Sequence, residues 1–545
     1  SVIKDSRRWL VDNALAEPSR ICIVGEVFGG YAAMMSAVKH PDLYECAASL
    51  NGISDLYSSV AKGRHYVGGF YFRRHIGRLW EGKELDRNSP INKQMRKAVL
   101  LMLAASEQNR IVSPRQSRRI YNALRKSNNP VEFIELPQGD HFLSREENRQ
   151  SFAQALLRFL DKTPLIDQHD KFGFYGNKFG GNFCAETMRK PIEDLSKLFE
   201  KLRKDKKFLS KRDHYFKHYL GGETPFFKLR NLTKHLGGAQ IWCKDVSAIN
   251  GDAHKAYHAT VNALICKESG KRYIAGDTGA GMFGKNLAMA AKKMNLKCKI
   301  FMGTKDISRQ APNVKFMRDA GAEVVPVDSG SKTLVDAVSE CMRHYVSNCD
   351  NTHLAVGSAI GCNIFLKICA WSTSQISKEL KKQLIKEFGE IPKLKLINVI
   401  GGGSSALGFW NEFIDYDKKH VELVGVEAKY AAPLSTNAKV AILHGAAQYC
   451  LTDQEGQIAD THSLSAGLDY PGSSPLHGLL KDTGRARYTN ASDKEALAAF
   501  KLITKLEDIR PSLEPAHAWS ECIRLAPKLK KSDVLVVNNC GKGYK

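Results

Sequence analysis

The sequence predicts an α/β protein built from two modules, and three observations support that prediction. The chain has 545 residues, more than a single hydrophobic core ordinarily serves. Over residues 1–163, short apolar runs alternate with amphipathic segments, which is the order of strands and helices around a parallel sheet. A polar stretch that contains proline, residues 164–170, is the expected linker to a second module at 171–545.

The first module is expected to hold four strands and four helices. Apolar runs predict strands at residues 20–25, 45–52, 97–106 and 131–137. Amphipathic periodicity predicts helices at residues 5–15, 32–40, 115–127 and 148–162. In the second module, residues 191–208 are expected to form a core-facing helix, because apolar residues recur there at helical spacing: Ile192, Leu195, Leu198, Phe199 and Leu202.

The composition limits the classes of protein to which the chain can belong. Hydrophobic residues make up 43% of it and charged residues 25%, as in a globular protein. No apolar run approaches the roughly 20 residues that cross a bilayer, so no membrane insertion is expected. The 13 cysteines are scattered without a C-x-x-C pair. This favours small buried side chains in a reducing compartment over a disulfide framework, and it indicates no metal site.

The net charge of +24, from 81 Lys and Arg against 57 Asp and Glu, is high. Basic side chains that neutralise phosphates release counterions and add affinity that does not depend on base sequence. The charge therefore fits a protein embedded among RNA phosphates. It fits equally a basic enzyme that is simply soluble, and charge alone leaves both interpretations open.

The stretch GEVFGGY, residues 25–31, has the outline of a nucleophile elbow, the sharp strand-to-helix turn that presents a catalytic side chain. Val27 occupies the tip of this turn, and valine has no nucleophilic atom. Gly25, Gly29 and Gly30 are then expected to serve packing, because they let the strand, the bend and the helix approach closely.

The exact sequence of the first module also resembles a known family, which its hydrophobic pattern alone does not reveal. The stretches RICIVGEVFGGYAAMMSAVKHPDLYECAASLNGISDL and RIVSPRQSRRIYNALRKSNNPVEFIELPQGDHF resemble the C-terminal half of a prolyl-oligopeptidase-type α/β-hydrolase, over about residues 1–163. The resemblance implies a Ser, Asp, His triad in chain order. Val27 stands at the Ser position, Asn109 at or near the Asp position, and His141 at the His position. Without a nucleophile the module is expected to be inactive.

The same resemblance bears on partners. The strands that precede the elbow in that family are absent from this chain, so the first strand is expected to be an open edge of a half sheet. Open edges carry unpaired backbone N–H and C=O groups, which natural proteins cover. A neighbouring protein is expected to cap this edge.

The second module resembles the β subunit of tryptophan synthase over about residues 166–545. The resemblance rests on the phrases FYGNKFGGNFCAETM, GDTGAGMFG, NVIGGGSSALGFWNEFI, GVEAKY, HSLSAGLDYPG and VVNNCGKG, which keep the family's order. It implies a type II pyridoxal phosphate enzyme fold of two α/β domains. The expected architecture of the whole chain is thus a partial α/β-hydrolase sheet followed by that fold.

The resemblance also implies site residues. Lys255 would bond the aldehyde of pyridoxal phosphate and move protons, and Asp277 would be the catalytic carboxylate. The other cofactor-binding positions are His254, Gly401, Gly402, Gly403, Ser404, Ser405, Glu427 and Cys540. The glycine-rich turn among them follows a strand and opens a helix, which suits a phosphate. The substrate-binding positions are Thr278, Gly279, Ala280 and Gly281, with Arg309 and Asp469 as the charged pair that closes the site.

Several positions depart from that family, and they cluster at the site. Asp277 replaces a longer Glu, and a misplacement of roughly 1 Å can cost about 100-fold in rate. The family's Gln-His after TGAG is Met282-Phe283, and its proline-rich segment is GCNIFL, residues 361–366. Further changes are KDVS at residues 244–247, Asp252 for Gly, Ser405 for Asn and Cys540 for Ser, the last of which related enzymes tolerate.

Two functions from different classes follow. The first is a non-catalytic pseudoenzyme, without cofactor, that serves as a structural subunit of a large ribonucleoprotein, with the mitochondrial ribosome in the matrix as the specific expectation. Its lysines and arginines would contact the RNA phosphate backbone. The alternative is a pyridoxal-phosphate-dependent lyase of the tryptophan synthase β type with an inactive hydrolase appendage, cytoplasmic unless imported. In either case the second module can dimerise.

Overall fold

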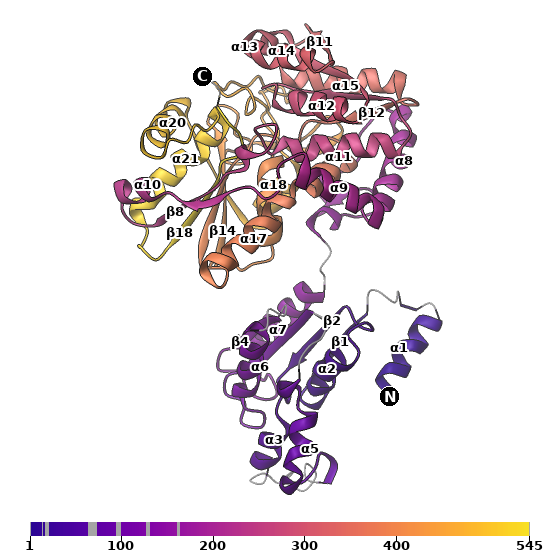
Figure 1. The fold of residues 1–545 in the computed structure, drawn as a ribbon, viewed down its shortest axis with the longest axis vertical. Helices are drawn as coiled ribbons and strands as arrows, with labels where there is room; N and C mark the ends of the chain where they lie inside the picture. Colours follow the sequence, from indigo (N-terminus) through magenta and orange to yellow (C-terminus); the bar gives the residue numbers. More distant parts are fainter. Residues whose placement is uncertain are drawn as a thin grey trace. The chain divides into compact units, whose positions relative to one another are not determined.

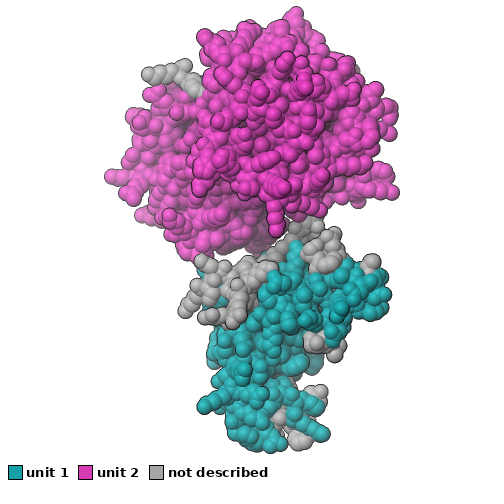
Figure 2. Space-filling model, turned by 45° about the vertical axis from the view of Figure 1, so that its right-hand side comes forward, with its two compact units in different colours: residues 1–162 teal, residues 163–545 magenta. Residues whose placement is uncertain are grey.

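The computed structural model describes residues 2–13, 15–16, 21–63, 74–93, 100–126, 131–160 and 164–543. The chain divides into two compact units, residues 1–162 and 163–545 (Figure 2). Residues 164–170, expected to be a linker, pack instead on the second unit. Ile166 is buried in its core, and Asp167 forms ion pairs with Arg203 and Lys367 at 2.7 Å each. Among the described helices none is long and apolar enough to cross a membrane.

The first unit is built on a four-stranded parallel sheet in the order β1-β2-β3-β4. The strands are β1 (Cys22–Glu26), β2 (Cys46–Leu50), β3 (Leu100–Ser106) and β4 (Val131–Leu136). They agree with the predicted runs, of which residues 20 and 97–99 lie outside the described residues. Because alternate side chains of these strands face opposite ways, the sheet has apolar residues on both faces, as a parallel sheet requires.

Three of the four predicted helices, the second to the fourth along the chain, pack against this sheet (Figure 1). The four predicted ones are α1 (Val2–Asp12), α2 (Phe28–Lys39), α6 (Pro114–Lys126) and α7 (Glu146–Leu160). The sequence pattern missed two short ones, α3 (Leu56–Gly63) and α5 (Gly82–Asn88), which pack in a small apolar cluster together with Ile53 and Val112. Strand β1 lies at one end of the strand order, and its Val24 side chain is 45% exposed.

The elbow keeps its strained backbone. Val27 has φ 53° and ψ −109°, a conformation that a β-branched residue rarely adopts. A Cβ at Gly25 would lie 2.1 Å from the backbone carbon of Gly29, and a Cβ at Gly30 would lie 2.6 Å from Ser49 Oγ, so both glycines are required for packing as predicted. The prediction was wrong for Gly29, where an added Cβ would meet open space.

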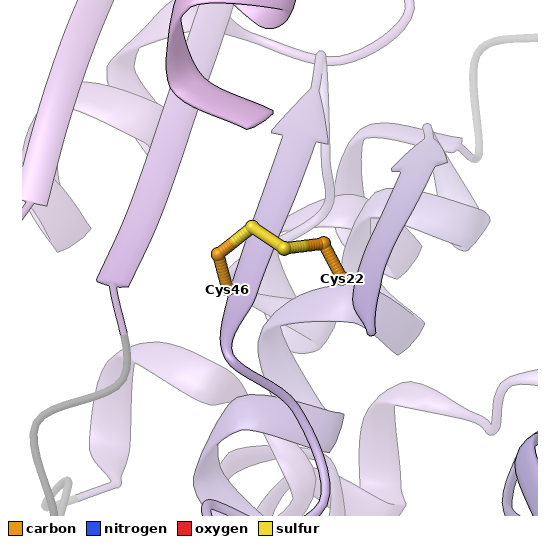
Figure 3. Close-up of a disulfide and its surroundings, with 2 residues drawn as sticks. All are labelled: Cys22 and Cys46. Atoms are coloured by element: carbon orange, nitrogen blue, oxygen red, sulfur yellow. A yellow bond between two sulfur atoms is a disulfide. The ribbon is translucent and has the colours of Figure 1, made fainter. Parts of the chain in front are cut away.

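A disulfide joins Cys22 of β1 to Cys46 of β2, which face each other in register (Figure 3). The expectation that cysteines would serve only as small buried side chains was therefore wrong for this pair. The sequence pattern did not predict this disulfide, because the two cysteines are 24 residues apart and become neighbours only through strand pairing. The bond ties the edge strand to the sheet.

The second unit contains three sheets. One has the parallel order β11-β10-β9-β12, and a larger one has the order β17-β14-β13-β18-β8-β7, parallel except for β7. The strands of the first are β9 (Tyr273–Asp277), β10 (Lys297–Gly303), β11 (Glu323–Val327) and β12 (Thr352–Ala355). Those of the second are β7 (Phe226–Lys228), β8 (Gln240–Lys244), β13 (Leu394–Val399), β14 (Val421–Ala428), β17 (Ala486–Ala491) and β18 (Val534–Asn538). Two α/β domains are the architecture expected for this module.

A third, antiparallel sheet has the order β15-β16-β6-β5. Its strands are β5 (Phe174–Tyr175), β6 (Phe179–Gly180), β15 (Lys439–Leu443) and β16 (Ala446–Cys450). It brings the start of the second unit beside a segment far later in the chain, since Gly180 pairs with Ala447.

Helices surround the sheets of the second unit (Figure 1). Around the first sheet lie α12 (Met282–Lys293), α13 (Thr304–Arg309), α14 (Ala311–Asp319) and α15 (Leu334–Asn348). Around the large sheet lie α10 (Arg230–Leu236), α20 (Asp493–Glu507) and α21 (Leu513–Leu525). The remaining ones are α11 (Lys255–Glu268), α16 (Asn363–Thr373), α17 (Gln375–Phe388), α18 (Ser404–Trp410) and α19 (Pro475–Asp482).

The helix predicted at residues 191–208 is in fact two helices, α8 (Glu186–Leu202) and α9 (Lys206–His218). The break comes from Asp205, whose carboxylate accepts N–H groups of Lys207 and Phe208 and so caps the second helix. The predicted apolar face is buried, apart from Leu198, which is partly buried.

Candidate active site

The site lies where parallel strands of the two large sheets end. Strand β9 ends at Asp277, β13 is followed by the glycine-rich turn at residues 401–403, and β18 is followed by Cys540. Ligands of open α/β sheets bind outside the carboxyl ends of the strands. Two adjoining cavities of about 70 and 40 Å³ lie here, and Lys255 lines both.

Lys255 is the first residue of α11, a helix buried along most of its length. Its Nζ donates a hydrogen bond to the carbonyl of Gly357 at 2.8 Å. Burial lowers the pKa of this amine below its usual value, because the charged form loses its hydration. A lysine of lowered pKa is a better nucleophile toward carbonyl groups at neutral pH.

Asp277 contacts the other main-chain polar group of Gly357, its N–H. Its Oδ1 accepts the N–H of Gly357 at 2.9 Å, so the Gly357 residue lies between the carboxylate and the Lys255 amine. Burial raises the pKa of Asp277 to about 6, and the Gly357 N–H and the charge of Lys255 only partly offset this. Such a carboxylate can accept and return a proton near neutral pH.

The glycine-rich turn forms one wall of the larger cavity, at Gly401, Gly402 and Gly403. A Cβ at Gly402 would lie 2.3 Å from Ser358 Oγ, and one at Gly403, where φ is +89°, would lie 2.2 Å from the ring of His477. Only glycine fits at either position, so main chain forms the wall.

Next to this turn His254 contacts Ser404. The Nδ1 of His254 faces the carbonyl of Cys540 at 3.3 Å and must therefore donate, which leaves Nε2 to accept from the Ser404 hydroxyl at 3.0 Å. Burial lowers the pKa of His254 to about 3, so the ring is neutral. This arrangement orients the Ser404 hydroxyl.

Cys540 lines the larger cavity, and burial raises the pKa of its thiol to about 12. The thiol is thus protonated and can form only weak hydrogen bonds. Beside it, Ser405 Oγ accepts the amide N–H groups of Asn398 and Asn538, both at 3.1 Å. These contacts help to fix the position of the glycine-rich turn at residues 401–403.

The smaller cavity is lined by the loop at Thr278, Gly279 and Ala280 and by mostly apolar side chains: Met282, Phe283, Leu334, Ile360 and Tyr470. Phe283 stacks on His258 with ring centroids 5.0 Å apart. With Met282 and Phe283 at these positions, this part of the cavity wall is apolar and the cavity stays open, while Lys255 and Asp277 remain its charged side chains.

Four predicted positions line neither of these two cavities: Glu427, Gly281, Arg309 and Asp469. Glu427 is not among the residues that line either cavity, because its carboxylate accepts the N–H groups of Leu434 at 2.9 Å and Ser435 at 2.6 Å. These bonds show that the carboxylate supports the local main chain, and its expected contact with the cofactor stays a prediction. Gly281 also lies outside both linings; its φ of +82° and a Cβ that would meet Asn313 at 2.6 Å explain the glycine.

Arg309 and Asp469 form the predicted ion pair, at 3.5 Å. Arg309 also pairs with the buried Asp306, so the pair is part of a three-residue cluster beside the substrate loop. Neither member of the predicted pair lines a cavity.

The sequence reasoning missed Glu514, which lines the larger cavity. Its carboxylate oxygens accept from the backbone N–H of Gly467 at 3.2 Å and from the hydroxyl of Ser512 at 2.6 Å. Ser358 and Tyr470 were missed as well. Glu514 and Ser358 stand in none of the quoted motifs, and Tyr470 stands in HSLSAGLDYPG without having been singled out; the fold brings all three to the cavities beside Lys255.

The first unit keeps a remnant of its triad. Asn109 Oδ1 and His141 Nδ1 are 3.3 Å apart, and Asn109 Oδ1 also accepts the N–H groups of Ile111 and Val112. His141 is therefore oriented as a base would be. Val27 at the tip of the elbow offers it no hydroxyl. Among the described residues no cluster of His, Cys, Asp and Glu could hold a metal.

Comparison with known proteins agrees with this site. Residues 218–541 match the family described as pyridoxal-phosphate dependent enzyme, and residues 3–164 match the prolyl oligopeptidase family. The chain therefore belongs to the pyridoxal-phosphate dependent enzyme family. Within that class its second unit is homologous to tryptophan synthase β chains, and its first unit is a prolyl oligopeptidase-type domain.

The curated relatives include the tryptophan synthase β chain of Nitrosomonas europaea, 40% identical over 70% of this chain and 97% of the relative. Those of Acinetobacter calcoaceticus and Chromobacterium violaceum are 38% and 39% identical, over 71% of this chain and 96% and 97% of theirs. Among solved structures, a threonine deaminase is 17% identical, with a TM-score of 0.48, over 62% of this chain and 97% of that one.

Proposed function

We propose that the second unit is a pyridoxal-phosphate-dependent lyase that acts at the β carbon of serine, with an inactive hydrolase-type unit attached. The observation that carries the proposal is the contact of both Lys255 and Asp277 with Gly357, which places the amine and the carboxylate together on the wall of the smaller cavity. The comparisons favour this alternative over a structural subunit without chemistry. A capping neighbour, RNA contacts, dimerisation and the compartment stay predictions.

The residues present fit the cofactor. The glycine wall at residues 401–403, where a side chain at Gly402 or Gly403 would clash, suits a phosphate, with the Ser404 hydroxyl beside it. Lys255 would hold the aldehyde end, and the neutral Cys540 thiol would face the ring nitrogen as a weak partner. When bound, pyridoxal phosphate withdraws electrons from the substrate and makes its α proton acidic.

This chain's own groups would perform the remaining steps. Backbone N–H groups of the loop at Thr278, Gly279 and Ala280 would bind the substrate carboxylate. The Lys255 amine, of lowered pKa, would take and return the α proton. Asp277, with a pKa of about 6, would donate a proton to the leaving hydroxyl and then accept one from the incoming nucleophile. The apolar walls at Met282 and Phe283 would exclude water.

Titration of the full chain with pyridoxal phosphate tests the cofactor site. We expect a visible absorbance band, loss of that band on addition of borohydride, and a pyridoxyl adduct on the peptide that contains Lys255. Lys255→Ala should lack the adduct and lose at least about 100-fold in serine turnover. Lys267→Ala, an exposed lysine on the same helix, is the matched control and should behave as wild type. Equal labelling of the two variants would contradict the proposal.

A further inference from the structure

Two free cysteines of the second unit lie side by side outside the cavities. Cys184 precedes α8, and Cys362 immediately precedes α16. The carbonyl of Gly445 accepts both the backbone N–H of Phe183 at 2.8 Å and the thiol of Cys362 at 3.8 Å. The two segments are thus held by one acceptor.

A second contact fixes the same two segments. The Oδ1 of Asn182 accepts the backbone N–H of Asn363 at 3.0 Å. Residues next to each cysteine are therefore bonded to the partner segment or to a shared group. The side chains of Cys184 and Cys362 also interact with each other.

The two thiols differ in chemistry. The neighbouring Cys362 thiol lowers the pKa of Cys184 to about 7, with a smaller contribution from Arg189. The pKa of Cys362 is raised, by that contact and by burial. Cys184 is partly exposed and Cys362 is buried. An accessible thiolate beside a second thiol is the arrangement of redox-sensitive cysteines.

We propose that Cys184 and Cys362 form a reversible oxidation site, which hydrogen peroxide converts to a disulfide. The Cys184 thiolate attacks one peroxide oxygen, the O–O bond breaks, and hydroxide leaves and is protonated to water. The sulfenic acid so formed is attacked by the Cys362 sulfur, which displaces the second oxygen as water once the Cys362 proton is transferred. Two thiols and one peroxide thus give one disulfide and two waters, and an added dithiol reverses the reaction.

The proposed oxidation site at Cys184 and Cys362 is connected to the active site by a short segment of the chain. Residues 357–361 run directly from Gly357, which joins Lys255 and Asp277, to Cys362. A disulfide needs its sulfur atoms about 2 Å apart, closer than hydrogen-bonded thiols. Oxidation must therefore bring the two sulfur atoms together, and the Cys362 sulfur, having lost its proton, can no longer donate to the Gly445 carbonyl. The inference goes beyond the proposed function, because the covalent bond can be measured whether or not the unit is a lyase.

The test treats the full chain with hydrogen peroxide, blocks remaining thiols by alkylation, and identifies linked peptides by mass spectrometry without reduction. We expect a peptide pair joined through Cys184 and Cys362 that disappears after dithiothreitol and is absent from Cys184→Ser and from Cys362→Ser. At pH 7 Cys184 should be alkylated about tenfold faster than Cys349, another partly exposed cysteine.

Cys349→Ser is the matched control and should leave the linked pair intact. Wild-type protein needs no substitution to be informative, so a variant that fails to fold does not remove the test. Oxidation of Cys184 to sulfinic or sulfonic acid without the linked pair would overturn the proposal, as would equal alkylation rates of Cys184 and Cys349.

Discussion

In the first unit a strained turn, with φ 53° at Val27, presents a side chain without a reactive atom, while the histidine and amide of the former triad stay 3.3 Å apart. In the second unit Lys255, Asp277 and the glycine wall stay together around two cavities. Both units therefore retain the backbone of a catalytic site. They differ in the reactive side chain, which shows that backbone geometry persists because packing requires it, independently of chemistry.

The largest effect that can sharpen this comparison is the loss of Asp277. Asp277→Asn should lower serine turnover by at least about 100-fold, because the neutral amide cannot accept a proton. In wild type, the step that needs the carboxylate as base should speed up as the pH rises through about 6, and the variant should lose that dependence. Steady-state rates from pH 5 to 8 measure it. A wild-type profile that the substitution leaves unchanged in shape and height would contradict the role of Asp277.

The same variant should be more stable than wild type at high pH. The pKa of Asp277 is raised from 3.8 to about 6 by folding, so the folded state binds more protons between these values and the free energy of unfolding falls as the pH rises through them. Two pKa units correspond to about 3 kcal/mol. Denaturant unfolding of Asp277→Asn and wild type at pH 4.5 and 8 should show the difference growing with pH. A constant difference would contradict it.

In the first unit the disulfide should affect stability alone. Cys22→Ser opens a loop of 24 residues and should lower the free energy of unfolding of this unit by about 3 kcal/mol. The transition of the second unit and the binding of pyridoxal phosphate should not change. Calorimetry resolves the two transitions, with Cys349→Ser as a cysteine control. A shift of both transitions together would show that the units are not independent.

The smallest effect concerns the elbow itself. Val27→Gly should stabilise the first unit by about 1 kcal/mol, because glycine relieves a conformation that costs about 1–3 kcal/mol and loses some of that gain to chain entropy. Val27→Ala keeps the Cβ and should give no gain. Chemical denaturation compares the two. A loss of stability with glycine would mean that the turn is not strained.

Restoring the nucleophile is a related test of the same turn. Val27→Ser should not create measurable esterase activity or labelling by a fluorophosphonate. Asn109, a neutral amide, cannot stabilise a charged His141 as a carboxylate would. Labelling of the serine variant, with wild type unlabelled, would show that the remnant site is competent and that a single side chain separates it from activity.

The sequence predicted the strands of the first sheet and the cluster around Lys255 because both depend on local patterns and motifs. It did not predict the break in the helix at Asp205, where one capping side chain outweighed a continuous apolar face. It also did not predict the bonds of the Glu427 carboxylate to the N–H groups of Leu434 and Ser435, because a motif does not show which main-chain groups fold against it. Glu514 and the Cys22–Cys46 bond were missed since they arise from contacts between distant segments.

The most direct test of the central claim is serine turnover by the full chain loaded with pyridoxal phosphate. The proposed lyase should consume serine in a reaction that requires the cofactor and is lost in Lys255→Ala, and product analysis with and without indole would separate replacement from elimination. Stoichiometric cofactor on Lys255 with no consumption of serine in either condition would contradict the claim. It would mean that the second unit, like the first, keeps the geometry of an active site without its chemistry.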